Sequence, residues 1–219
     1  VENAIIKARH AAECTGLPAI SDDSGIEVDA LDARPGVWSA RYAGEDASDA
    51  DNVALLLEKL DGVPEPHRGA RFVCAMALLR FPSDPVPLIC EGSWQGRIAM
   101  SPRGSGGFGY DPVFITADGR TSAELSAAEK NRLSHRGQAV RELVRREKNL
   151  VPGGLVVVCK AGAGVSDLGD PPRELGVAQG TGIAQFGLGQ VRPIGGTQWI
   201  ECEVLLDVRD QQLLVLLLV

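Results

Sequence analysis

The feature that most constrains the fold is the run Ser-Asp-Asp-Ser-Gly at residues 21–25, which lies between two segments that read as strands. Residues 17–20 form a short apolar run, and residues 26–31 alternate apolar and polar with the period of a half-buried strand. On extended backbone, adjacent side chains point to opposite faces, so only one of Asp22 and Asp23 can face a given cleft. A carboxylate at a strand end is a common ligand of Mg²⁺, which prefers hard oxygen donors. The alternative is a simple turn, in which Asp and Ser bond to local amides.

Charge and cysteine usage exclude several classes of function. The chain has 219 residues with a formal net charge of −7, which disfavours the broad basic face that a nucleic-acid polymer requires. An acidic protein can still bind a small polyanion when a metal and a few local cations neutralise it. Five cysteines, an odd number, occur without C-x-x-C spacing, which argues against a disulfide framework or zinc site and predicts a cytoplasmic protein. The longest apolar run, residues 213–219, is too short to span a bilayer.

Local patterns predict helices alternating with strands. Good helix formers at residues 2–12 predict a helix that ends at Gly16, and on it Asn3 and Lys7 share a face because they are four apart. Capping boxes at Ser48/Asp51 and Ser126/Glu129 predict two further helix starts, and Ser134 predicts a fourth. We therefore expect the α/β class with a mixed sheet.

Two segments with strand composition follow the second predicted helix. Residues 71–81 place Phe72, Cys74 and Met76 on one face, and residues 88–100 contain Gly92 and Gly96, which suggest bulges or bends. The residues between these segments read as a turn, so we expect an antiparallel pair.

Residues 104–112 form a glycine-rich stretch that suits close approach to a ligand. Four glycines let the backbone come near a bound group, and Phe108 and Tyr110 offer faces for a planar base. The alternative is a flexible loop before a strand at residues 113–115.

A compact group of donors follows in the sequence. Lys130, His135 and Arg136 come together if Ser134 caps a helix, because His135 and Arg136 then lie at its amino end, where backbone N–H groups also favour anions. The alternative is an ordinary charged surface.

The composition changes after about residue 149. Residues 150–219 hold 12 of the 26 glycines and a single lysine, and they contain no nucleotide, metal or nucleophile motif. Residues 155–158 and 199–208 are candidate strands. We therefore divide the chain into residues 1–149 and 150–219.

Taken in order, three stretches closely resemble the inosine-triphosphate pyrophosphatase family. They are residues 21–25, residues 106–112 (Gly-Gly-Phe-Gly-Tyr-Asp-Pro), and Glu129-Lys130 with residues 134–137 (Ser-His-Arg-Gly). Residues 2–8 and the segment from Pro35 to Tyr42 also look like the family. The resemblance runs from residue 1 to roughly residue 148.

This resemblance implies a fold, an activity and partners. The fold is an elongated, twisted mixed sheet with flanking helices and an active-site cleft between two lobes, usually as a homodimer. The activity is magnesium-dependent hydrolysis of non-canonical purine nucleoside triphosphates (ITP, dITP and XTP) to the monophosphate and pyrophosphate, which cleanses the nucleotide pool. No nucleic-acid polymer or membrane partner is implied.

The resemblance also assigns roles to individual residues. Asp23 is the metal ligand and general base, with Asp22 as a second candidate ligand of Mg²⁺, and Lys7 faces the phosphates. The remaining substrate-binding residues are Ser24, Phe108, Gly109, Tyr110, Asp111, Lys130, His135 and Arg136.

Two departures from the family pattern concern the ends of the chain. Family members begin with a strand and a Ser/Thr-x-Asn-x-x-Lys phosphate loop followed by a metal-binding Glu, so we expect a chain truncated at its amino end. Residues 150–219 have no counterpart, and a shifted or fused reading frame is favoured over an appended domain. The rival functions are a purine-nucleotide-binding remnant without turnover and an α/β domain without a ligand.

Overall fold

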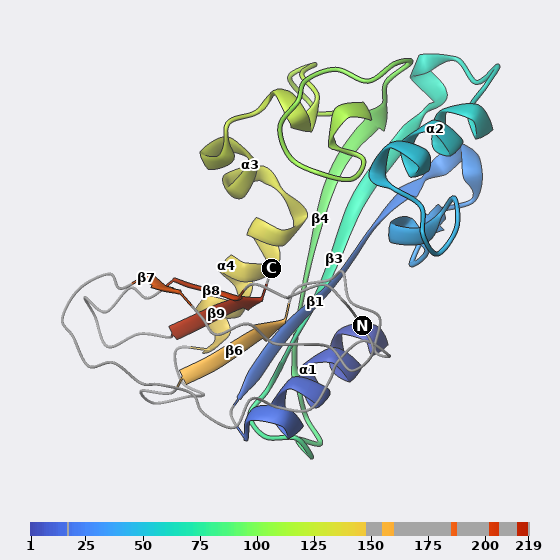
Figure 1. The fold of residues 1–219 in the computed structure, drawn as a ribbon. Helices are drawn as coiled ribbons and strands as arrows, with labels where there is room; N and C mark the ends of the chain where they lie inside the picture. The colour runs from blue at the N-terminus through green and yellow to red at the C-terminus, as the bar shows by residue number, and fades with distance from the viewer. Residues whose placement is uncertain (17, 148–154, 160–184, 188–201, 206–213, 219) are drawn as a thin grey trace. The chain divides into compact units, whose positions relative to one another are not determined.

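The computed structural model describes residues 1–16, 18–147, 155–159, 185–187, 202–205 and 214–218 (Figure 1). The chain divides into two compact units, in agreement with the two lobes that the resemblance implies. Unit 1 comprises Val1–Asp23, Met76–Cys90 and Leu143–Val219, and unit 2 comprises Ser24–Ala75 and Glu91–Glu142. Within the described residues, no helix has the length and apolar character needed to cross a membrane.

A mixed β-sheet with flanking helices confirms the predicted fold class. The strands follow the order β5-β4-β3-β1-β6-β9-β8-β7, and β2 pairs with β1 off this path. The β1–β6 pair is parallel, whereas β4–β5 and β1–β2 are antiparallel. The strands are β1 (Ala19–Val28), β2 (Arg34–Gly36), β3 (Gly69–Leu79), β4 (Leu88–Ile98), β5 (Phe114–Ile115), β6 (Leu155–Cys159), β7 (Gln185–Gly187), β8 (Cys202–Leu205) and β9 (Leu214–Leu218).

The helices begin where the sequence predicts them, and α1 ends at the predicted glycine. α1 (Glu2–Thr15) ends at Gly16, whose φ of 67° lies in the left-handed region that glycine adopts without strain. Capping boxes at Ser48 and Ser126 open α2 (Asp49–Lys59) and α3 (Ala127–Leu133). α4 (His135–Glu147) begins directly after Ser134, whose hydroxyl accepts a hydrogen bond from the Gly137 amide at 3.1 Å.

The interpretation of residues 21–25 as a turn or a strand end is wrong, because they lie in the middle of β1. Two contacts explain why the polar run stays extended. The hydroxyl of Ser21 is buried and donates to the main-chain oxygen of Ala4 at 2.5 Å. A Cβ atom at Gly25 would overlap the carbonyl oxygen of Gly36, so the glycine permits β2 to pack closely on β1. Tertiary partners therefore override the local turn propensity of Asp, Ser and Gly.

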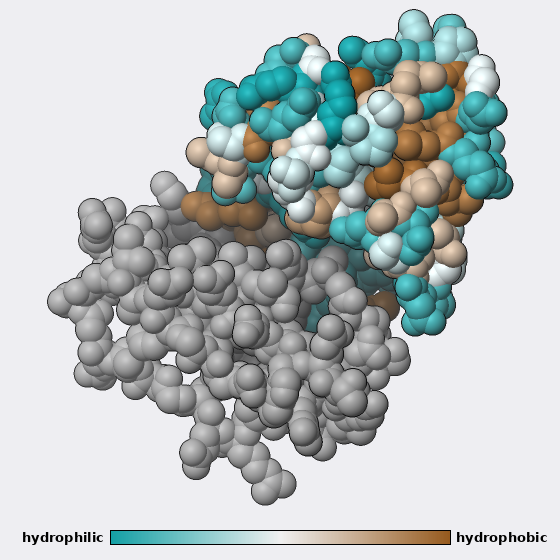
Figure 2. Space-filling view, turned by 45° about the horizontal axis from the view of Figure 1, so that its top comes forward, coloured by the Kyte–Doolittle hydropathy of each residue, from teal (hydrophilic) through white to brown (hydrophobic). Residues whose placement is uncertain are grey.

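An aromatic cluster forms the core of unit 2. Phe72, Trp94 and Phe114 pack together, with ring centroids 4.4 Å apart for Phe72 and Phe114 and 5.2 Å apart for Trp94 and Phe114. The predicted inward face of β3 is confirmed, because Phe72, Cys74 and Met76 are all buried. On the face shown in Figure 2, the described residues expose polar side chains together with more than one apolar area.

Gly92 and Gly96 mark close packing, where the sequence had suggested bulges or bends. Both glycines lie within the continuous strand β4. A Cβ atom at Gly92 would overlap the carbonyl oxygen of His135 and come within 3.0 Å of the Ala139 amide nitrogen, so α4 crosses the strand at this point. At Gly96 the added atom would overlap the Ile115 carbonyl oxygen.

We expect Gly92→Ala to destabilise the protein by about 3 kcal/mol, the upper range for overpacking, because the clashing atoms belong to backbone that cannot rotate away. Thermal unfolding measures the loss, with Ser93→Ala on the same strand as the control, since Ser93 is exposed. An unchanged melting temperature in Gly92→Ala would show that α4 does not pack this closely on β4.

The strands after residue 150 agree in part with the sequence. β6 and β8 fall within the candidate strands at residues 155–158 and 199–208, give or take one residue, and β9 lies in the apolar end. β6 pairs with β1 so that Ala19 lies opposite Val157. The division at residue 149 and the favoured shift of reading frame stay predictions.

Candidate functional site

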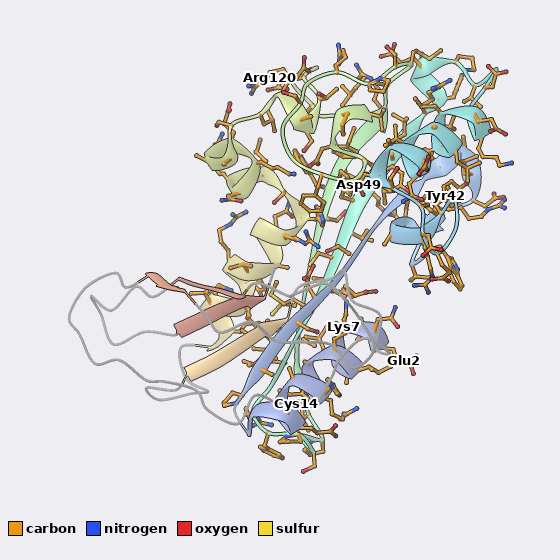
Figure 3. All side chains as sticks on the ribbon, viewed as in Figure 1. Glu2, Lys7, Cys14, Tyr42, Asp49 and Arg120 are labelled. Atoms are coloured by element: carbon orange, nitrogen blue, oxygen red, sulfur yellow. The ribbon has the colours of Figure 1, made fainter. Side chains whose placement is uncertain are left out.

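A carboxylate and a lysine lie together in unit 1, where α1 packs beside β1. The Nζ atom of Lys7 donates to Asp23 Oδ1 at 3.0 Å and to the main-chain oxygen of Asp22 at 2.6 Å. Asn3, one helical turn before Lys7, donates from Nδ2 to Asp23 Oδ2 at 3.2 Å. Lys7 is labelled in Figure 3, where it projects from α1. The prediction that Asn3 and Lys7 share a face of the helix is therefore confirmed, and we call Asn3, Lys7 and Asp23 the carboxylate–lysine group.

The carboxylate–lysine group holds its charges in a partly covered setting. The side chain of Lys7 is 9% exposed, and that of Asp23 is 23% exposed. The Asp23 carboxylate offsets part of the free-energy cost of removing the Lys7 ammonium from water. The partial exposure of Asp23 leaves its oxygens within reach of a small ligand.

Asp22 and Asp23 do not converge, because neighbouring residues on β1 face opposite sides. Asp22 is 6% exposed, against the more open Asp23. Among the described residues, no three side chains of the His, Cys, Asp and Glu types gather closely enough to form a metal cage. One or two carboxylates nevertheless suit Mg²⁺, which takes its other ligands from water and substrate phosphates.

Phe108 and two cations form a second group, which lies in unit 2. Phe108 as a residue is 56% exposed. Lys130 Nζ lies 4.9 Å from the ring centroid, and Arg136 Cζ lies 5.3 Å from it. We call these three residues the aromatic–cation group. It brings together a planar face and two hydrogen-bond donors, as the sequence predicts.

Asp111 ties the glycine-rich loop to the cations from within. Its buried carboxylate forms an ion pair with Lys130 and accepts hydrogen bonds from Ser122 Oγ at 2.8 Å and from the Phe108 amide at 2.9 Å. At Gly107 the φ is 77°, and a Cβ atom would overlap this carboxylate, so glycine is required there. Asp111 therefore sets the positions of Lys130 and of the loop.

The expectation that the Tyr110 ring offers a face to a base is wrong. Tyr110 is 5% exposed and packs in the core, where its hydroxyl donates to the main-chain oxygen of Ser39 at 2.8 Å. Burial, helped by the neighbouring Tyr42 and Asp49, raises the pKa of Tyr110 well above its usual value. The hydroxyl therefore remains a protonated donor that anchors the loop.

His135 packs inward at the start of α4, and Arg136 faces the loop. The His135 ring is 8% exposed and stacks on Phe72 at a centroid distance of 4.9 Å and an interplanar angle of 12°. Of the predicted donors, the structure thus brings Lys130 and Arg136 to Phe108. Direct contact of His135 and Ser24 with substrate stays a prediction.

An ion-pair network fixes the helix that carries Lys130. Arg120, labelled in Figure 3, donates to Glu129 Oε1 at 2.9 Å and to Asp118 Oδ2 at 2.7 Å. The hydrogen bond from Arg120, with those from Ser126, lowers the pKa of Glu129 to about 2. Glu129 therefore stays ionised near neutral pH, and its capping box keeps the start of α3 in place.

One contact to the glycine-rich loop was missed by sequence reasoning. Asp49, on the first turn of α2, accepts a hydrogen bond from the Gly109 amide at 2.5 Å. These residues lie 60 positions apart, so no local pattern connects them. Acidic residues are common in the first turn of a helix because they interact favourably with the helix dipole, so Asp49 did not stand out in the sequence.

Known proteins resemble this chain along its first two thirds. The sequence model of the Ham1 family matches residues 1–146. A dITP/XTP pyrophosphatase of Shigella flexneri is 56% identical over 150 residues, which cover 68% of this chain and 76% of that protein. A dITP/XTP pyrophosphatase of Vibrio parahaemolyticus is 57% identical over 144 residues, with 65% and 72% covered.

Solved structures agree with these sequence matches. A HAM1 protein from Coxiella burnetii superimposes with a TM-score of 0.62 at 55% identity, covering 65% of this chain and 73% of that one. A dITP/XTP pyrophosphatase from Mycobacterium abscessus gives a TM-score of 0.56 at 48% identity, with 67% and 74% covered. These matches confirm the resemblance that the ordered motifs carry. The chain belongs to the Ham1 family.

Proposed function

We propose that this chain hydrolyses non-canonical purine nucleoside triphosphates (ITP, dITP and XTP) to the monophosphate and pyrophosphate. The observation that carries the proposal is the aromatic–cation group, in a chain that is 56% identical over 150 residues to a protein named dITP/XTP pyrophosphatase. It combines a stacking face with donors, which are the two elements needed to bind a purine that has a keto oxygen.

The aromatic–cation group selects the base by hydrogen-bond matching. Phe108 stacks on any purine, because every base has a π-face. Lys130 and Arg136 carry N–H donors, which pair with the 6-keto oxygen of hypoxanthine or xanthine. Adenine has an amino group at that position, so the donors would lose their partner, and leaving donors unpaired makes binding of the wrong base costly.

The carboxylate–lysine group acts on the phosphates. A water molecule attacks the α-phosphorus, its proton passes to the Asp23 carboxylate, and the bond from the α-phosphorus to the bridging oxygen breaks to release pyrophosphate. Lys7 offsets the negative charge of the phosphates from its position beside Asp23. Asp23, with Asp22 as a second candidate, would hold Mg²⁺, which when bound supplies further neutralisation of the phosphate charge.

The family resemblance and the composition support three further expectations. The donor chemistry of Asp23 suits magnesium as the metal. The odd number of cysteines suits the reducing cytoplasm. The resemblance supports a homodimer as the assembly.

A pyrophosphate-release assay tests the proposed function. With Mg²⁺ present, we expect dITP, ITP and XTP to yield monophosphate and pyrophosphate in equal amounts, ATP to react at least about 100-fold more slowly, and a chelator to stop the reaction. Release of orthophosphate would contradict the proposed bond cleavage, and equal rates with ATP would contradict the base selection. ITP binding without turnover would instead select the remnant that only binds nucleotide.

A further inference from the structure

Within unit 2, the residues 104–111 that carry Phe108 form a loop that needs restraint from outside. Gly104, Gly107 and Gly109 have φ values of 79°, 77° and 58°, so the loop depends on glycine conformations with wide backbone freedom. A flexible loop lowers the affinity for a ligand, because each additional conformation reduces the fraction of molecules in the conformation that binds. Contacts from ordered elements must therefore select one conformation.

Two carboxylates supply such contacts to neighbouring amides. Asp111 Oδ2 accepts from the Phe108 amide at 2.9 Å, and Asp49 Oδ2 accepts from the Gly109 amide at 2.5 Å. Asp111 belongs to the loop's own end, whereas Asp49 belongs to α2. The Tyr110 hydroxyl and the Gly106 amide bond to main-chain oxygens of Ser39 and Ala123, whereas the Asp49 contact ties the amide directly after Phe108 to α2.

The helix that carries Asp49 is itself firmly placed. The capping box of Ser48 and Asp51 defines its start, and Leu56 and Leu60 are fully buried in the core. Asn52 bridges to the preceding segment, because its Nδ2 donates to Ala40 O at 3.1 Å and its Oδ1 accepts from the Ala43 amide at 2.8 Å. The backbone that carries Asp49, which is labelled in Figure 3, is therefore held in a defined position.

We propose that Asp49 is a positioning residue for base recognition: its carboxylate holds the Gly109 peptide so that the Phe108 ring stays beside Lys130 and Arg136. Asp49 touches the loop and has no part in the chemical step. This inference rests on the proposed function for its effect on catalysis, but the restraint on the loop can be measured without substrate.

The structural half of the test is amide hydrogen exchange of the free protein. Asp49→Ala should speed exchange in the peptide covering residues 104–111 by about 10-fold, because a hydrogen bond to a charged acceptor is lost. Asp49→Asn keeps an oxygen acceptor and should restore most of the protection. The matched control is Glu58→Ala, which removes an exposed carboxylate near the other end of α2 and leaves the capping box and Asp49 in place.

The functional half separates KM from kcat. Asp49→Ala should raise KM for dITP by about 10-fold with kcat and melting temperature nearly unchanged. Glu58→Ala should leave both KM and the melting temperature nearly unchanged, because the Glu58 side chain is exposed and lies away from the start of α2. A KM that rises only together with a matching loss of melting temperature in Asp49→Ala, or that rises equally in Glu58→Ala, would reduce Asp49 to a structural role and overturn the inference.

The two proposals fail in distinguishable ways. If the unaltered chain neither hydrolyses nor binds dITP, the proposed function fails, and exchange alone decides the role of Asp49. If the unaltered chain is active but Asp49→Ala leaves exchange and KM unchanged, the inference about Asp49 fails and the proposed function stands.

Discussion

Replacing Asp23 with asparagine should lower the turnover of dITP by about 10³-fold, within the range lost when a general base is removed. Asparagine has the same shape but cannot take a proton, and its neutral oxygen is a much weaker ligand for Mg²⁺. The fold should survive, because Lys7 keeps its 2.6 Å hydrogen bond to the Asp22 main-chain oxygen and Asn3 keeps an oxygen partner. We expect stability to fall by about 2 kcal/mol, the worth of a hydrogen bond between charged groups.

Pyrophosphate release and thermal unfolding measure the two effects in parallel. Asp32→Asn is the matched control, because it makes the same chemical change at a side chain that is 94% exposed, and asparagine tolerates the φ of 53° found there. Retained binding of ITP in Asp23→Asn would confirm that the loss lies in the chemical step. Turnover close to that of the unaltered chain would show that Asp23 is neither base nor metal ligand.

Replacing Arg136 with alanine should collapse the preference for ITP over ATP. Loss of a charged donor to the keto oxygen should lower kcat/KM for ITP by about 10²-fold, whereas ATP gives that donor no acceptor and should change little. The ratio of the two kcat/KM values reports this directly. Phe108→Ala should weaken both nucleotides about equally, by roughly 10-fold or more, because stacking carries no base preference.

Arg132→Ala provides the control for loss of a positive charge nearby. Arg132 lies exposed at the end of α3, so its removal changes the charge without altering the aromatic–cation group. If Arg136→Ala leaves the ITP-to-ATP ratio unchanged while both values fall, Arg136 contacts the phosphates and the assignment to the base is incorrect.

Features with a local cause could be predicted from the sequence. Capping boxes and the glycine after α1 involve residues at most four positions apart, so the pattern contains both partners of each interaction. The shared face of Asn3 and Lys7 follows from helical spacing in the same way. The ordered motifs carried the family, because several short matches in one order rarely coincide by chance.

Predictions failed where a distant partner decides the outcome. Residues 21–25 have turn propensity, but the Ala4 oxygen and the close approach of Gly36 keep them in β1. The sequence predicts a bulge or bend at Gly92. In the structure, glycine is needed there because the backbone of α4, more than 40 residues further along the chain, packs against it. The Tyr110 ring suited a base by its chemistry, yet it is buried with its hydroxyl on Ser39.

The sequence by itself therefore determined the starts of the helices, the end of α1, the family and most of the candidate donors, since these depend on short-range spacing and on residue identity. Only the tertiary structure decided which of those side chains are exposed and which are anchored. It placed Phe108 at the surface and Tyr110 in the core, although both residues are direct neighbours of Gly109 in the sequence. It also brought the Asp49 carboxylate to the Gly109 amide, 60 positions away in the sequence. The physical reason is that burial and hydrogen bonding in a loop depend on the surfaces packed around it, and distant parts of the chain supply those surfaces.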